Sequence, residues 1–70
     1  MTFGQKLREL REIAGYTQQA LADEVGVQWL TIQRYESQGR VPDVLLAKRL
    51  ARALGVTLDE LLCDVDGGGK

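Results

Sequence analysis

Side chains able to act as nucleophiles, general bases or metal ligands are scarce in this 70-residue sequence. It contains no histidine, a single cysteine (Cys63) and a single serine (Ser37). Histidine is the commonest general base and metal ligand, and a nucleophile–base relay needs partners that this chain does not offer. One cysteine excludes both an intramolecular disulfide and a cysteine-rich zinc site. The residue types therefore predict no metal site and no nucleophilic enzyme.

The acidic pairs and the terminal glycines do not change that prediction. Asp23-Glu24 and Asp59-Glu60 are sequence neighbours in helical segments. Neighbouring side chains on a helix point about 100° apart, so the two carboxylates of each pair do not face each other as an acid and a base. The glycine-rich residues 67–70 have no helix behind them and do not form a phosphate-binding loop. We expect no enzymatic activity, no cofactor and no small-molecule effector.

The elements that position the remaining polar residues are helices, because apolar residues recur between glycines at helical spacing. The first helix is predicted from Thr2 to Gly15, with Phe3, Leu7, Leu10 and Ala14 on one face. The other predicted helices run from Thr17 to Gly26, over 28–36, from Asp43 to Gly55, and onward from Thr57. These segments predict a compact all-α domain over residues 1–65 and a disordered tail over 66–70.

Two of these helices meet at a tight turn within residues 17–36. Gly26 supplies the left-handed backbone of the turn, which costs most other residues about 1–2 kcal/mol. Ala22 is small enough for the two helices to cross closely. A helix-turn-helix of this kind leaves the second helix protruding, with its N-terminal half free to enter the major groove of DNA.

The sequence resembles the phage-repressor/Cro-like helix-turn-helix family, also called the XRE family. The resemblance runs from Phe3 to Leu62 and rests on FGQKLRELRE, TQQALADEVGV, TIQRYE and PDVLLAKRLARALGVTLDELL. It implies a five-helix lambda-repressor-like fold, with the helix-turn-helix at the second and third helices. It also implies a sequence-specific DNA-binding transcriptional regulator of prokaryotic or phage type, which pairs as a homodimer on double-stranded DNA.

The resemblance assigns roles to individual residues. Gln18 matches a phosphate-contacting position, and Arg40 in a later loop is a candidate for contact with the DNA backbone. Arg34 can bond guanine, and Gln28 or Gln33 can bond adenine. The predicted DNA-binding residues are Thr17, Gln18, Gln28, Trp29, Leu30, Gln33, Arg34 and Arg40. Arg11 and Glu36 match a family pair that forms a structural salt bridge.

Trp29 and Leu30 depart from the family pattern, which usually has polar residues at these positions. They can pack on a thymine methyl group, or they can be the contact surface of a protein-interaction module with an antitoxin-like or adaptor role. The three glutamines can also be ordinary solvated residues. A second departure is Gly39, which comes one residue later than is typical and changes the aim of the loop that carries Arg40.

The formal net charge of −1 is unusual for a chain that binds DNA. Residues 28–52 carry five basic and two acidic side chains, a balance of +3, whereas residues 57–70 carry one basic and four acidic, a balance of −3. The whole-chain value thus averages a basic segment with an acidic end.

The predicted dimer surface is the last helix and the residues that follow it, with Leu61, Cys63 and Val65 as candidates, although Leu61 can instead be a core residue. The sequence shows no membrane span or signal peptide, so we expect a cytoplasmic protein.

Overall fold

Five helices joined by short loops make up the described part of the chain. The computed structural model describes residues 2–38 and 40–62, and no strand occurs within them. The helices are α1 (Phe3–Ala14), α2 (Gln18–Val25), α3 (Trp29–Gln38), α4 (Val44–Leu54) and α5 (Leu58–Leu62). The all-α prediction is confirmed. The predictions for Cys63, Val65 and the tail over 66–70 lie outside the described residues.

Local side-chain caps begin four of the helices, as predicted. Thr2 accepts a hydrogen bond from the backbone N–H of Gln5 at 3.2 Å, and the Gln5 side chain accepts one from the N–H of Thr2 at 3.0 Å. Thr17 and Asp43 each accept from the N–H three residues later, at 3.0 and 2.9 Å. Thr57 also accepts from the N–H three residues later, at 3.0 Å, and its own N–H donates to the Glu60 carboxylate at 2.9 Å. These bonds satisfy N–H groups that have no partner inside the helix.

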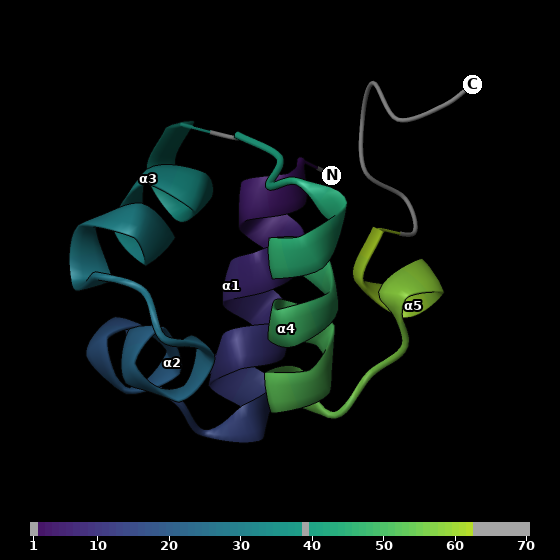
Figure 1. Ribbon diagram of the computed structural model, residues 1–70, viewed down its shortest axis with the longest axis horizontal. Helices are drawn as coiled ribbons and strands as arrows, with labels where there is room; N and C mark the ends of the chain where they lie inside the picture. Colours follow the sequence, from purple (N-terminus) through teal and green to yellow (C-terminus); the bar gives the residue numbers. More distant parts are fainter. Residues whose placement is uncertain (1, 39, 63–70) are drawn as a thin grey trace.

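The helices enclose one small core. In Figure 1, α1 and α4 run side by side through the centre, α2 and α3 cover one side, and α5 covers the other. Each helix contributes buried apolar side chains, namely Phe3, Leu7, Leu21, Ala22, Val25, Ile32, Ala47, Leu50, Ala51, Leu54 and Leu61. Packing all five helices around these residues leaves the outer surface of α3 free for other contacts.

Three sequence predictions need correction. α3 begins one residue later and ends two residues later than the predicted 28–36. Ala14 is exposed, so the buried face of α1 ends earlier than its periodicity suggested. Leu61 is 0% exposed because α5 packs on both α1 and α4, and its side chain belongs to the core. It is therefore not available as the dimer contact offered above.

Phe3 and Tyr35 hold the start of α1 against α3. Their rings meet edge to face, with centroids 6.3 Å apart and planes at 85°, an arrangement that aromatic quadrupoles favour. Burial raises the pKa of the Tyr35 hydroxyl above its ordinary value of 10.0; the nearby Asp43 carboxylate raises it further, against a smaller lowering by Arg40. Phe3 is therefore a core residue, as its place on the apolar face of the first helix predicted, and Tyr35 packs against the core.

Candidate nucleic-acid interface

The turn between α2 and α3 depends on Gly26 and Ala22. Gly26 has a left-handed φ of 80°, a conformation that glycine adopts without steric cost. The N–H groups of Gly26 and Val27 both donate to the carbonyl oxygen of Ala22 at 2.9 Å. The Ala22 side chain is 0% exposed, so its small size permits the close crossing of the two helices. The predicted helix-turn-helix at α2 and α3 is present.

An ion pair between Arg11 and Glu36 fixes the C-terminal half of α3 to α1. Arg11 Nε donates to Glu36 Oε2 at 2.7 Å, and Nη2 donates to Oε1 at 3.3 Å, so the guanidinium binds the carboxylate with two bonds. The same guanidinium donates through Nη1 to the carbonyl oxygen of Tyr16 at 2.8 Å. The two side chains are 11% and 5% exposed. The predicted salt bridge is therefore present, and it lies largely out of water.

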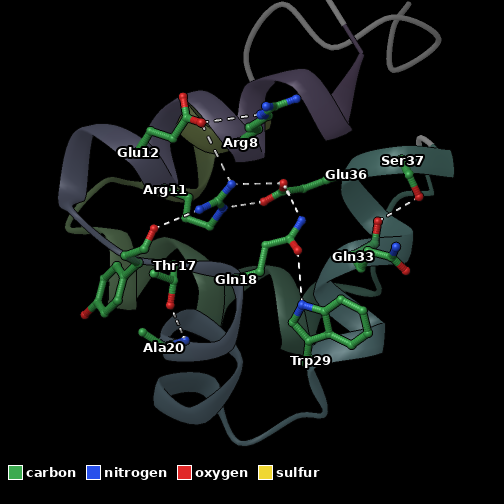
Figure 2. Close-up of polar contacts among 11 residues, drawn as sticks. Arg8, Arg11, Glu12, Thr17, Gln18, Ala20, Trp29, Gln33, Glu36 and Ser37 are labelled. Carbon is green, nitrogen blue, oxygen red and sulfur yellow. Dashed lines mark hydrogen bonds and ion pairs between the residues drawn. The ribbon is translucent and has the colours of Figure 1, made fainter.

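Gln18 extends this ion pair toward the front of α3. Its Nε2 donates to Glu36 Oε1 at 3.0 Å, while its Oε1 accepts from the indole Nε1 of Trp29 at 3.1 Å. Figure 2 shows Gln18 lying between the carboxylate of Glu36 and the indole of Trp29. The polar contacts thus run without a break from Arg11 on α1 to the first residue of α3.

The structure brings half of the predicted DNA-binding residues to one open cleft of about 700 Å³. Its lining includes Thr17, Gln18, Trp29 and Gln33, together with the Arg11–Glu36 pair. Gln28, Leu30, Arg34 and Arg40 do not line it, and all four are exposed. The two groups form a solvent-facing surface over the start of α2 and the length of α3, with Arg40 in the loop that follows.

Several residues of this region were not predicted from the sequence as site residues. The cleft is also lined by Arg8, Tyr16, Gln19 and Ser37. Gly4 is buried where α1 crosses α3, and a Cβ atom there would lie 2.5 Å from the carbonyl oxygen of Glu36 and 2.6 Å from that of Tyr35. A glycine within a helix was the available signal, because glycine there is unfavourable unless the backbone needs a close approach.

Two other kinds of site, a metal centre and a membrane span, find no support in the described residues. Within 2–38 and 40–62, no group of three or more His, Cys, Asp or Glu side chains is placed to hold a metal ion. In the same two segments, no helix has the length and apolar character needed to cross a membrane. The candidate site is the surface of α2 and α3 with its open cleft.

A family model described as helix-turn-helix matches residues 7–61. The chain belongs to this family. That assignment confirms the resemblance to phage-repressor/Cro-like proteins noted from the sequence. The match covers all of α2, α3 and α4 and the turns between them.

A curated relative is also a helix-turn-helix protein. A SPbeta prophage-derived uncharacterized HTH-type transcriptional regulator, YonR of Bacillus subtilis (strain 168), is 37% identical over 60 residues, which are 86% of this chain and 56% of that protein. The chain thus spans little more than half the length of that curated relative.

Two solved structures superpose on most of the chain. The restriction-modification controller protein C.AhdI from Aeromonas hydrophila is 36% identical, with a TM-score of 0.78 over 84% of this chain and 89% of that one. The P22 c2 repressor in complex with synthetic operator 9T is 27% identical, with a TM-score of 0.80 over 96% and 97%. The helical arrangement described above is therefore that of repressor-type helix-turn-helix domains.

Proposed function

We propose that this protein is a sequence-specific DNA-binding transcriptional regulator that inserts α3 into the major groove. One observation carries the proposal: α3 is anchored at its far end by the buried Arg11–Glu36 pair, while its front is exposed. Trp29 and Leu30 are 43% and 39% exposed, and Arg34 is exposed one turn further along. A rigid helix with a free N-terminal half is what groove reading needs. The repressor that the fold matches was solved with an operator.

The DNA-binding residues divide into two roles on this proposal. Thr17, Gln18 and Arg40 contact phosphates and set the register, which carries no sequence information directly. Gln28, Gln33 and Arg34 read base edges, because an amide can bond adenine twice and a guanidinium can bond guanine twice. Trp29 and Leu30 pack on thymine methyl groups or sugars. Access to DNA then places the protein in the cytoplasm.

A titration of labelled duplexes tests the proposal. Duplexes selected from a random pool are titrated at two salt concentrations, and the affinity should fall steeply as salt rises because phosphate contacts release counterions. Arg34→Ala should weaken binding to the selected duplex about 5- to 150-fold, about 1–3 kcal/mol. The control is Arg52→Ala, the same charge change at an exposed position of α4. It should leave the preference for the selected duplex unchanged.

Two outcomes would count against the proposal. Failure to bind any member of the pool at low salt would favour the protein-interaction module instead, with Trp29 and Leu30 as its contact surface. Equal effects of Arg34→Ala and Arg52→Ala would mean that α3 does not read bases. Either result is visible in the same titration, since both variants and the unmodified protein are compared on one set of duplexes.

We further propose that the protein binds DNA as a homodimer. A single module of this type buries only about 600–1,000 Å² on DNA, and pairing sets two recognition helices about 34 Å apart along the duplex. The candidate surface is the exposed end of α5, where Leu62 is 38% exposed, together with Cys63 and Val65 that follow it in sequence. Pairing two copies through Leu62 would remove this exposed apolar side chain from water.

Sedimentation over a range of protein concentrations tests the pairing. Leu62→Glu should shift the equilibrium toward monomer, because it places a charge in the proposed interface. Ile13→Glu is the matched control, since it places the same charge at an apolar residue of α1 that is 76% exposed and is not part of the proposed interface. A chain that sediments as a monomer throughout, or that responds equally to both substitutions, would contradict the proposed dimer surface.

A further inference from the structure

The side-chain amide of Gln18 connects the two ends of α3. It is the first residue of α2, and its two partners, Trp29 and Glu36, lie 11 and 18 residues further along the chain. Trp29 is the first residue of α3, and Glu36 lies near its end. One side chain that lines the open cleft at the start of α2 thus contacts residues at both ends of α3 (Figure 2).

These two partners allow only one orientation of the amide. A carboxylate only accepts hydrogen bonds and an indole N–H only donates, so the amide nitrogen must face Glu36 and the amide oxygen must face Trp29. Glutamate lacks the donor and lysine lacks the acceptor, so neither satisfies both contacts. The two contacts therefore need a side chain that both donates and accepts, as the Gln18 amide does.

The hydrogen bond with Gln18 restrains the partly exposed side chain of Trp29. Trp29 is 43% exposed at the front of α3, and its N–H is bonded to Gln18 at 3.1 Å. Gln18 is itself restrained through Glu36, which the Arg11 guanidinium holds with bonds of 2.7 and 3.3 Å. An ion pair that is buried in the domain thereby fixes the position of an exposed aromatic ring.

We propose that Gln18 is a positioning residue for DNA recognition, holding the indole of Trp29 in one orientation so that its free face meets apolar groups in the major groove. The inference rests on the proposed function. The thymine C5-methyl is the apolar group that the base edges offer there. The second N–H of the Gln18 amide remains available for a phosphate oxygen, so this role is compatible with the phosphate contact proposed above.

The indole itself provides a direct test, because Trp29 is the only tryptophan in the chain. Time-resolved fluorescence anisotropy of the free protein measures the independent motion of the ring. Gln18→Met removes both hydrogen bonds at similar length, and Gln18→Lys keeps a donor for Glu36 but offers no acceptor to Trp29. Both variants should add a fast component to the anisotropy decay. Gln19→Met is the control, because the Gln19 amide bonds only to Asp23 on its own helix.

The second arm measures affinity for the selected duplex. Gln18→Met should weaken binding about five- to tenfold, the equivalent of about 1–1.4 kcal/mol. In a Trp29→Phe background, which lacks the N–H, the same substitution should weaken binding less than it does in the unmodified protein, because only the proposed phosphate contact of Gln18 is then lost. Circular dichroism confirms that each variant is folded before it is compared.

The two arms separate this inference from the proposed function. Unchanged anisotropy decays in both Gln18 variants would overturn the inference, whatever the DNA affinity. So would a released indole with unchanged affinity for the selected duplex. If the unmodified protein binds no duplex, the proposed function fails and the role in recognition fails with it, while the anisotropy arm still decides whether Gln18 restrains the ring.

Discussion

Substitution of Arg11 by alanine removes the cation of the buried Arg11–Glu36 pair. The carboxylate of Glu36 would keep a single donor, Gln18, and the carbonyl oxygen of Tyr16 would lose the 2.8 Å bond from the guanidinium. Because the two side chains are only 11% and 5% exposed, water replaces the lost partner poorly. Removing one member of a buried pair costs about 3–5 kcal/mol, mostly because the other charge is left unpaired.

That loss is large compared with the stability of a domain of this size. At about 0.05–0.15 kcal/mol per residue, 70 residues provide about 4–10 kcal/mol. A loss of 3 kcal/mol lowers the melting temperature by about 12–24 °C in so small a domain. Arg11→Ala should therefore retain at best a marginally stable fold.

Urea unfolding followed by far-UV circular dichroism measures the effect, with unchanged slopes as the check that only stability has changed. Arg8→Ala is the control, because Arg8 pairs with Glu12 through side chains that are 67% and 58% exposed. An exposed pair of that kind contributes less than about 1 kcal/mol. Adding Glu36→Gln to Arg11→Ala should recover part of the loss by removing the unpaired charge. A loss below about 0.5 kcal/mol for Arg11→Ala, the range of ordinary surface substitutions, would refute this reasoning.

Three further predictions concern α3 and its contacts. Gly4→Ala should destabilise the protein by about 1–3 kcal/mol in the same urea assay, because the new Cβ would lie 2.5 Å from the Glu36 carbonyl oxygen; a gain in stability, as helix propensity alone predicts, would contradict the close approach. Because the pKa of Tyr35 is raised in the folded state, its hydroxyl contributes stability that is present below about pH 10 and is lost as the pH rises through the folded-state pKa. The urea midpoint of the unmodified protein should therefore fall more steeply over this pH range than that of Tyr35→Phe, and a parallel fall would contradict the prediction. Replacing thymine by uracil in a selected duplex should weaken binding by the unmodified protein but not by Leu30→Ala, and equal losses in a titration would exclude methyl contact by Leu30.

Helix positions followed from the sequence because the groups that begin and end helices are near neighbours. Thr2, Thr17, Asp43 and Thr57 each bond a backbone N–H three residues away, so their roles depend on local spacing alone. The turn at Gly26 depends likewise on the backbone preference of one residue. These local interactions establish the starts of four helices and the turn between α2 and α3 without any knowledge of tertiary packing.

The long-range contacts were a different problem. The Arg11–Glu36 pair joins residues 25 positions apart, and only the resemblance to a family predicted it. The bonds from Gln18 to Trp29 and Glu36 were not predicted, because a glutamine on a helix surface has no sequence signal that identifies its partner. The same holds for Gly4, since its reason for being glycine lies in the backbone of residues 35 and 36.

By itself, the sequence determined which segments are helical, where α1, α2, α4 and α5 begin, and that α2 and α3 meet at a glycine turn. Only the tertiary structure decided which side chains those helices bring together. It placed Leu61 in the core rather than on the surface, and it tied an exposed Trp29 to a buried ion pair through Gln18. The physical reason is range: caps and turns involve atoms a few residues apart, whereas burial and side-chain pairing depend on how the helices cross.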